Sequence, residues 1–367
     1  MQEIISHNNS HKEIEKILKM IGTQKFLLVK DSAFGFLGLD GFFKNLNVPF
    51  VEFSDFTVNP LYEDVCKGVD LFNSQDCDAI VAIGGGSTID VAKCIKLFCK
   101  MDKSENYLKQ EFLDTGIPLI ALPTTAGTGS ESTRYAVIYY KGEKQSVTSE
   151  SIIPNYAVLE PNVLKTLPIY QKKCSLLDAL CQAIESWWSV NSNDESRGYS
   201  KIAVEKIIKH YNDYIINPSD DVLCEIMTAS NYAGRAINIT ATTSAHAMSY
   251  KMTSLYGIPH GHAVAIGLPH IWEYMIANPQ NCIDARGEKY LLYAFSDIAK
   301  SLGCDTADEA VKMFKELLSE LDLEGPKATK DELKLLTASV NVGRLKNNPV
   351  KLSEDVLYEL YSKITQR

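Results

Sequence analysis

The sequence predicts an α/β domain followed by an all-helical domain. Three observations support this prediction: the length, the alternation of strand-like and helix-like segments in the first part, and the helix-like segments that follow. The 367 residues suggest about two domains and allow a large buried core. A hydrophobic fraction of 45% and a charged fraction of 23% exclude a disordered chain.

The first part alternates short apolar runs with helix-like segments. The apolar runs are residues 26–30, 79–83 and 118–122, and each is bounded by turn residues. Residues 62–73 and 88–99 lie between them and have helical character. Continuous apolar strands that alternate with helices indicate a parallel sheet covered on both faces.

From about residue 175 the pattern changes to helices alone. The helix-like segments of this part are residues 176–190, 200–214, 222–236, 310–321 and 354–365. Pro154, Pro161 and Pro168 punctuate the junction between the two patterns. We therefore place the boundary near residue 165, which gives domains of residues 1–165 and 166–367.

The composition also narrows the class of protein. A net charge of −9 argues against binding nucleic acid or an anionic membrane through bulk charge, although it leaves room for a local anion site. No apolar run approaches the roughly 20 residues that span a bilayer, and the first residues have no secretory apolar core. The nine cysteines show no zinc-finger spacing, so we expect free thiols in the cytoplasm.

A glycine-rich turn follows the second apolar strand. Gly84, Gly85, Gly86, Ser87 and Thr88 open the next helix. Consecutive glycines let a ligand approach the backbone, and free N–H groups at a helix start favour a phosphate. The alternative is a tight strand-to-helix turn without a ligand.

A second polar turn, residues 123–131, follows the third apolar strand and is rich in small and hydroxyl side chains. Two such turns at the ends of parallel strands suit a dinucleotide lying across the edge of the sheet. Asp31 ends the first strand. Its carboxylate can accept hydrogen bonds from ribose hydroxyls and would repel a 2′-phosphate, or it can cap a helix.

Four of the seven histidines fall within 25 residues, and two of them are candidate metal ligands. On a helix, Asp178 and Gln182 are four residues apart and share a face. A carboxylate with His246 and His260 forms a ligand set for Fe²⁺ or Zn²⁺ that leaves room for a substrate. A single histidine is more often structural, but the pair His260 and His262 before an apolar segment favours at least one ligand.

Together these segments resemble the iron-containing (group III) alcohol dehydrogenases. The matching segments, in the order of that family, are residues 59–60, 84–93, 123–131 and 178–180, His246 and residues 259–261. The resemblance implies a dehydroquinate-synthase-like fold, in which a Rossmann-type domain and a helical domain border a cleft for NAD or NADP and a divalent metal. The candidate cofactor residues are Asp31, Gly85, Gly86, Ser87, Asp90, Thr124, Thr125, Thr128 and Ser130.

The resemblance also implies a metal set of one aspartate and three histidines. Asp178, His246 and His260 match three of these positions, and Gln182 stands where the fourth histidine is expected. The glutamine offers only a carbonyl oxygen, which is a weaker ligand than imidazole. The site is therefore expected to hold Fe²⁺ or Zn²⁺, to bind metal weakly, or to use three ligands and water.

The family implies hydride transfer between a nicotinamide and an aldehyde or alcohol carbon, with the metal as Lewis acid. The developing alkoxide needs a proton, and Tyr250, His262 and metal-bound water are the candidates. Tyr250 stands where many members carry a histidine near the nicotinamide, but it can also simply fill space. His262 can instead lie behind the ligands or at the rim of the site.

Two cations indicate an anionic substrate. Arg134 follows the second polar turn and Lys144 matches a family position near the cleft, so they favour an aldehyde with a phosphonate, phosphate or sulfonate group. The alternative for each is a surface salt bridge. Residues 245–265 and 344–350 resemble the phosphonoacetaldehyde reductase branch, which reduces phosphonoacetaldehyde to 2-hydroxyethylphosphonate in phosphonate biosynthesis.

Three other functions stay open at this point. The first is a general short-chain alcohol or polyol dehydrogenase. The second is a lyase of the dehydroquinate synthase type, although the polar turn at residues 123–131 fits the dehydrogenases better. The third is a metal-poor, inactive relative with a binding or structural role. The expected partner is a small molecule, and a homodimer is the default assembly.

Overall fold

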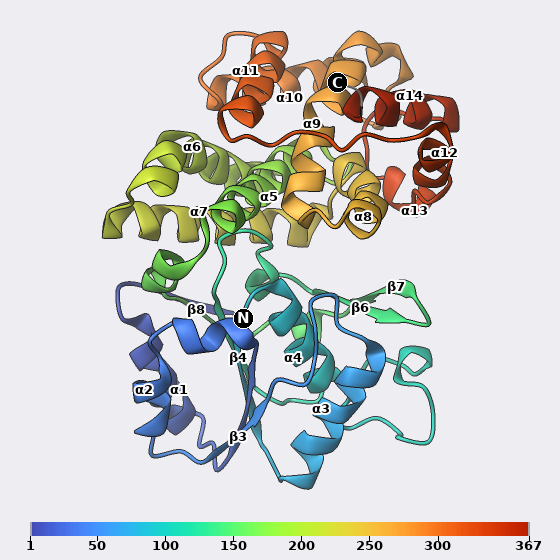
Figure 1. Cartoon of the computed structure of the whole chain (residues 1–367). Coiled ribbons are helices and arrows are strands. Elements are labelled where there is room, and N and C mark those ends of the chain that lie inside the picture. The colour runs from blue at the N-terminus through green and yellow to red at the C-terminus, as the bar shows by residue number, and fades with distance from the viewer. Residues whose placement is uncertain (1, 366–367) are drawn as a thin grey trace. The chain divides into compact units, whose positions relative to one another are not determined.

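The structure, a computed structural model, describes residues 2–365. Its internal contacts divide the chain into two compact units (Figure 1). The first unit contains the described residues up to Leu167 and the segment Pro218–Asn231. The second contains Pro168–Asn217 and the described residues from Tyr232 onward.

The first unit is built around a parallel sheet of six strands in the order β1-β8-β5-β4-β2-β3. The strands are β1 (Glu3–Ser6), β2 (Phe26–Lys30), β3 (Phe50–Phe53), β4 (Ala79–Gly84), β5 (Leu119–Pro123) and β8 (Tyr156–Leu159). Every residue of β4 and β5 is buried, as expected for central strands covered on both faces. Strands β2, β4 and β5 are neighbours, so the turns that follow them meet at one edge of the sheet.

Helices cover both faces of this sheet. In Figure 1, α1 and α2 lie on one side of it, and α3 and α4 lie on the other. The bounds are α1 (Glu13–Met20), α2 (Asp40–Lys44), α3 (Tyr62–Ser74) and α4 (Gly86–Phe98), with the antiparallel hairpin β6 (Tyr135–Tyr140) and β7 (Glu143–Thr148). Short 3₁₀ helices occupy Ser10–Lys12, Ser32–Phe36, Tyr107–Lys109, Ser130–Ser132, Glu150–Ile152 and Pro161–Thr166.

The second unit is helical. Its helices are α5 (Ile169–Trp188), α6 (Asp194–Ile216), α7 (Asp220–Thr240, with the first part in the other unit), α8 (Ser244–Tyr256), α9 (His260–Ala277), α10 (Glu288–Ser301), α11 (Ala307–Glu320), α12 (Lys330–Ala338), α13 (Val342–Leu345) and α14 (Glu354–Ile364). A 3₁₀ turn forms at Pro279–Asn281. Helix α5 is buried at every position from Leu176 to Trp188. It is the central helix, and it packs against α6 and α9.

The prediction of an α/β part followed by a helical part is confirmed. The sequence did not locate the edge strands β1 and β3 or helices α8 and α9. Short strands carry little periodicity, and α8 and α9 have weak amphipathic character because most of their faces are buried. No helix in residues 2–365 is long and apolar enough to cross a membrane. All nine cysteines are free thiols.

Candidate metal centre and nucleotide-binding turns

Three side chains of the second unit converge on one point. Asp178 comes from α5, His246 from the first turn of α8, and His260 is the first residue of α9. One possible ligand atom from each lies within 4.8 Å of the others. His246 Nε2 is 3.4 Å from Asp178 Oδ1, and His260 Nε2 is 4.0 Å from the same oxygen. The structure therefore brings together three of the four predicted metal ligands.

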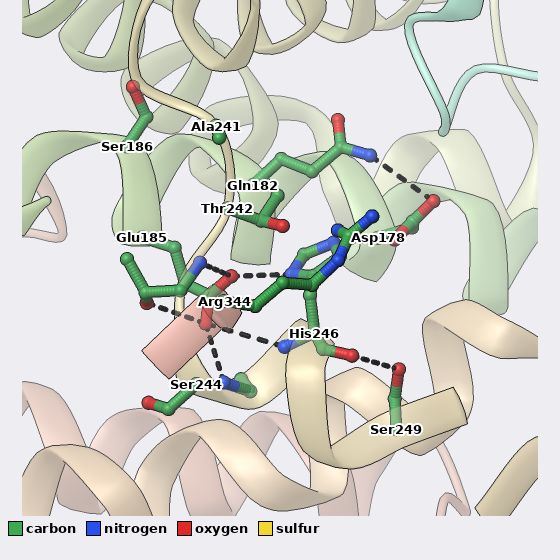
Figure 2. A network of polar contacts seen from close by, with 12 residues as sticks. Asp178, Gln182, Glu185, Ser186, Ala241, Thr242, Ser244, His246, Ser249 and Arg344 are labelled. Carbon is green, nitrogen blue, oxygen red and sulfur yellow. Dashed lines mark hydrogen bonds and ion pairs between the residues drawn. The ribbon is translucent and has the colours of Figure 1, made fainter. Parts of the chain in front are cut away.

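Glu185 holds His246 in place (Figure 2). It lies on α5 seven residues after Asp178, so both carboxylates point from the same face of that helix. The Glu185 side chain is fully buried and accepts a hydrogen bond from His246 Nδ1 at 2.5 Å. It also accepts from the backbone N–H groups of Thr243 (3.1 Å) and Ala245 (2.6 Å), and from the Thr243 hydroxyl (2.8 Å). Glu185 thus caps the start of α8 and fixes the orientation of the first imidazole.

This orientation leaves His246 Nε2 directed at the site. Because Nδ1 donates to Glu185, Nε2 of the neutral ring carries a lone pair. Among the described residues it forms no hydrogen bond, although it is buried. A lone pair 3.4 Å from a carboxylate oxygen is repelled unless a proton or a cation lies between them. Burial favours the neutral ring, but the carboxylates of Glu185 and Asp178 raise the pKa of His246 to about 9. A divalent cation fits this arrangement and would take the place of the proton.

His260 is fixed in a similar way. Its Nδ1 lies 3.1 Å from the hydroxyl of Ser249, which leaves Nε2 on the side of Asp178. The side chain of His260 is 35% exposed, whereas those of Asp178 and His246 are 5% and 4% exposed. The metal centre is therefore open on the His260 side, where a substrate can approach.

Gly261 explains how α9 comes so close to α5. A Cβ atom at this position would lie 2.0 Å from the carbonyl oxygen of Cys174 and 2.9 Å from Asp178 Cβ. Only glycine allows this approach of two helices, and the approach places His260 beside Asp178.

Gln182 lies one helical turn after Asp178 and is buried. Its Nε2 donates to Asp178 Oδ2 at 3.4 Å (Figure 2). In this orientation the amide nitrogen faces the carboxylate, so Gln182 supports Asp178. Its role as a ligand through the carbonyl oxygen stays a prediction.

Tyr250 lies on α8, one turn after His246, and its ring stacks on that of His260 with centroids 5.4 Å apart and an interplanar angle of 3°. Its hydroxyl accepts a hydrogen bond from Arg344 Nη1 at 2.8 Å. The structure therefore brings Tyr250 to the metal centre, and its role as proton donor stays a prediction.

His262 has different neighbours. Its Nδ1 is 2.8 Å from the Tyr170 hydroxyl, and its Nε2 is 3.0 Å from the carbonyl oxygen of Glu324. The ring must donate from Nε2 to the carbonyl and accept at Nδ1, and burial lowers its pKa. Two residues after His260 on a helix, it points to the other side of α9. The contacts give no support to a role as proton donor, which stays a prediction.

The glycine-rich turn after β4 is held by Asp31. The carboxylate of Asp31 accepts hydrogen bonds from Thr88 Oγ1 (2.8 Å), Gly85 N (3.3 Å) and Ala33 N (2.9 Å). A Cβ atom at Gly84 would lie 2.2 Å from Thr88 Oγ1 and 2.6 Å from Asp31 Oδ2. Asp31 therefore caps the following 3₁₀ helix and ties β2 to this turn, as the structural alternative predicted. Its contact with a ribose stays a prediction.

The start of α4 fits a phosphate. Gly85 is its N-cap residue, and no side chain caps the helix. A Cβ atom at Gly85 would meet nothing closer than Thr125 Cγ2 at 3.8 Å, so the backbone has open space here. The free N–H groups at residues 86–88, next to Ser87, suit the diphosphate of a dinucleotide.

The second polar turn packs directly on the first. Thr124 N donates to Gly84 O at 3.0 Å, and a Cβ atom at Gly86 would lie 2.8 Å from Thr128 Cγ2. Thr125 is half-buried beside Gly85. The structure thus brings both predicted turns together at the carboxyl edge of β4 and β5.

Lys93 is the centre of a polar network under these turns. Its Nζ donates to Ser130 Oγ (3.1 Å), Thr133 O (2.7 Å) and Tyr135 O (2.7 Å). Asp90 Oδ1 accepts from Ser130 Oγ at 2.7 Å. Burial raises the pKa of Asp90 and lowers that of Lys93 to about 8. Asp90 and Ser130 therefore link α4 to the second turn, and their contact with a cofactor stays a prediction.

The two predicted substrate cations belong to the first unit. Arg134 is half-buried and forms an ion pair with the exposed Glu150 at 2.5 Å, which is the predicted alternative of a salt bridge. Lys144 is half-buried on β7, opposite Tyr139 of β6. Their role in substrate recognition stays a prediction.

Sequence reasoning assigned no individual role to three residues that shape these sites. Glu185 could have been found, because it shares the helix face of Asp178 and Gln182 at a spacing of four and then three residues. Lys93 lies one turn after Asp90, and a lysine between apolar residues in a helix indicates a buried partner. Arg344 begins the segment 344–350, which resembles the phosphonoacetaldehyde reductase branch, but its contact with Tyr250 depends on how the chain folds back 94 residues later.

Comparisons with known proteins agree with this geometry. The family "Iron-containing alcohol dehydrogenase" matches residues 2–161, and "Fe-containing alcohol dehydrogenase family, C-terminal" matches residues 174–365. Phosphonoacetaldehyde reductase of Streptomyces viridochromogenes is 30% identical over 77% of this chain and 75% of its own length. Aldehyde-alcohol dehydrogenase 2 of Entamoeba histolytica is 31% identical over 73% of this chain, which spans only 33% of that larger protein.

A solved structure supports the same assignment. The sulfoacetaldehyde reductase of Bifidobacterium kashiwanohense, in complex with NAD⁺, has a TM-score of 0.90 and 25% sequence identity, and the match covers 99% of this chain and 97% of that chain. The family matches together cover most of the sequence. This chain therefore belongs to the iron-containing alcohol dehydrogenase family, whose members reduce aldehydes or oxidise alcohols.

Proposed function

We propose that this chain reduces a small aldehyde bearing an anionic group, such as phosphonoacetaldehyde, to the corresponding alcohol with NADH or NADPH. The observation that carries the proposal is the centre of Asp178, His246 and His260, which is open on the His260 side. When bound there, Fe²⁺ or Zn²⁺ would supply Lewis-acid chemistry, and the nicotinamide would supply the hydride. Two relatives are named for two-carbon aldehydes with a phosphonate or a sulfonate group, which supports the anionic substrate.

The residues of the chain have distinct roles in this proposal. Asp178, His246 and His260 would hold the metal, with Gln182 as a fourth ligand or as a support for Asp178. Glu185 and Ser249 contact the Nδ1 atoms of the two imidazoles and so direct both Nε2 atoms toward Asp178. The domain of residues 1–165 would bind the dinucleotide through the two turns, and that of residues 166–367 would bind the metal.

The proton for the developing alkoxide would come from Tyr250 or from water. Tyr250 stacks on His260, and its hydroxyl, which accepts from Arg344, is a group that can donate a proton. His262 is the weaker candidate, because Tyr170 and the Glu324 carbonyl engage both of its ring nitrogens.

A substrate panel tests the proposal. The purified protein would be supplied with Fe²⁺ or Zn²⁺, and oxidation of NADH and NADPH would be followed with phosphonoacetaldehyde, sulfoacetaldehyde and propanal. We expect kcat/KM to be at least about tenfold higher for an anionic aldehyde than for propanal, because a charged partner for the substrate is worth more than about 1.4 kcal/mol. Equal or faster reduction of propanal would indicate a general alcohol dehydrogenase, and no turnover with any metal would indicate an inactive relative.

The Arg134→Ala variant tests the predicted role of that cation. If Arg134 contacts the substrate, the variant loses activity with phosphonoacetaldehyde and keeps part of its activity with propanal. Equal loss with both substrates would mean that the ion pair with Glu150 is structural. A cytoplasmic location, a homodimer and a place in phosphonate biosynthesis are further parts of the proposal.

A further inference from the structure

We propose that Arg344 is the residue that recognises the acid group of the substrate. In this proposal Tyr250 holds the Arg344 side chain beside the metal centre. This inference rests on the proposed reduction of an anionic aldehyde and names the side chain responsible. Arg344 belongs to the same compact unit as Asp178, His246 and His260.

A continuous series of contacts joins Arg344 to His260, one of the proposed metal ligands. Arg344 lies on α13, and its Nη1 donates to the Tyr250 hydroxyl at 2.8 Å. Its Cζ atom is 5.1 Å from the centroid of the Tyr250 ring, and that ring stacks on His260. In Figure 2 the Arg344 side chain extends from α13 toward Asp178 and Gln182. One aromatic ring therefore separates the guanidinium from His260, the half-buried histidine of the centre.

The charge of Arg344 is not balanced by a carboxylate among the described residues. It is half-buried, and no aspartate or glutamate within residues 2–365 forms an ion pair with it. By contrast, Arg134 pairs with Glu150, and Arg286 pairs with Asp284 at 2.6 Å. A partly desolvated cation beside a metal site is unfavourable unless an anion binds there. A substrate with a phosphonate, sulfonate or carboxylate group would supply that anion.

The shape of the guanidinium also suits this role. Arginine has five N–H donors in a planar fork, of which one is used for Tyr250. The remaining edge can donate two parallel hydrogen bonds to two oxygens of an acid group. Tyr250 fixes the plane of the fork, so little conformational entropy is lost when the anion binds. Tyr250 and Arg344 therefore orient the substrate with its acid group on α13 and its carbonyl toward His260.

The test compares Arg344→Met, Arg344→Lys and a matched control, Arg235→Met, in the metal-loaded enzyme. Arg235 also stacks on a tyrosine, with its Cζ 4.1 Å from the Tyr199 ring, but it makes no contact with the metal centre among the described residues. For each variant, kcat/KM is measured with phosphonoacetaldehyde and with propanal. Binding of 2-hydroxyethylphosphonate is measured by calorimetry.

We expect Arg344→Met to lower the ratio of kcat/KM for phosphonoacetaldehyde over propanal by about 100-fold, mainly through KM, because two charge-assisted hydrogen bonds are lost. Binding of 2-hydroxyethylphosphonate should weaken by a similar factor. The kcat/KM ratio of Arg344→Lys should lie between those of the unmodified enzyme and Arg344→Met, because lysine keeps the charge but lacks the planar fork of donors. Arg235→Met should leave the ratio unchanged.

The outcomes separate this inference from the proposed function. If the unmodified enzyme prefers phosphonoacetaldehyde and Arg344→Met keeps that preference, the function stands and Arg344 is not the recognition residue. Equal losses on both substrates would assign Arg344 a structural role and overturn the inference. If the unmodified enzyme shows no preference for the anionic aldehyde, the proposed function fails, and the inference fails with it.

Discussion

Replacing Glu185 with glutamine would change the tautomer of His246. Glu185 Oε1 accepts from the Thr243 hydroxyl and Ala245 N, and Oε2 accepts from Thr243 N and His246 Nδ1. A glutamine has only one side-chain oxygen. If that oxygen replaces Oε1, the NH₂ group replaces Oε2 and faces the N–H donors of Thr243 N and His246 Nδ1. His246 can relieve the clash by moving its proton to Nε2, because Nδ1 then accepts from the amide.

This change acts on the metal site and on stability separately. A proton on Nε2 removes the lone pair that would bind the metal. Moving this proton back to Nδ1 would again place the Nδ1–H group against the amide N–H group of the glutamine. We expect metal affinity to fall by about 10- to 100-fold, the range found when partners of metal-bound histidines are removed. Thr243 N would stay without an acceptor, which lowers the free energy of unfolding by about 1–3 kcal/mol.

Glu160→Gln is the matched control. Glu160 is also a buried carboxylate with a histidine partner, since His11 Nδ1 lies 2.7 Å from its Oε2, but it belongs to the first unit. Zn²⁺ affinity would be measured by competition with a chromophoric chelator, and stability by urea unfolding. We expect the control to lose stability and to keep its metal affinity.

Two results would refute the reasoning. If Glu185→Gln binds Zn²⁺ as tightly as the unmodified protein while remaining folded, Glu185 does not control the His246 tautomer. If Glu160→Gln weakens metal binding equally, the loss reflects general destabilisation and not the loss of one particular hydrogen bond.

Three further predictions concern single positions. Gly261→Ala should lower the free energy of unfolding by about 1–3 kcal/mol and weaken metal binding, because its Cβ would meet a backbone oxygen at 2.0 Å. Gly267→Ala on the same helix is the control: the atom nearest to its Cβ is at 3.7 Å, so stability and metal binding should stay unchanged in the same assays. Burial alone would raise the pKa of Glu160, but hydrogen bonds from His11 and Asn162 lower it from 4.5 to about 2. The stabilisation by Glu160 should therefore be complete above about pH 4.5 and disappear as the pH falls toward 2. In urea unfolding, the free energies of Glu160→Gln and the unmodified protein should differ by up to ~3 kcal/mol at neutral pH and become equal in acid. A difference that stays constant with pH would contradict this prediction. Gln182→His should raise Zn²⁺ affinity by about tenfold or more, because imidazole is the better ligand, and unchanged affinity in the chelator assay would place residue 182 outside the metal sphere.

Much of the architecture could be predicted from local patterns. The central strands β2, β4 and β5 are continuous apolar runs, because they are covered on both faces. The edge strand β3, with its one buried residue, carried too little pattern to be located. The hairpin β6–β7 was not located either, because its half-exposed strands depend on packing for their definition.

The candidate ligands could also be predicted, but their supports could not. Asp178, His246 and His260 are indicated by residue type and by the family pattern. Whether a predicted residue can bind a ligand depends on its neighbours. Asp31 and Asp90 accept hydrogen bonds from other residues of the protein, and both ring nitrogens of His262 have hydrogen-bond partners. These bonds join segments that are far apart in the chain, so no local pattern indicates them.

The sequence by itself determined the fold class, the family and the types of side chain at the metal centre, because these depend on periodicity and on short motifs. The tertiary structure decided which atoms face the site. Glu185 selects the tautomer of His246, Gly261 lets α9 approach Asp178, and the return of the chain at α13 places Arg344 on Tyr250. Each of these effects depends on distances of a few ångströms between distant residues, and only the folded chain sets such distances.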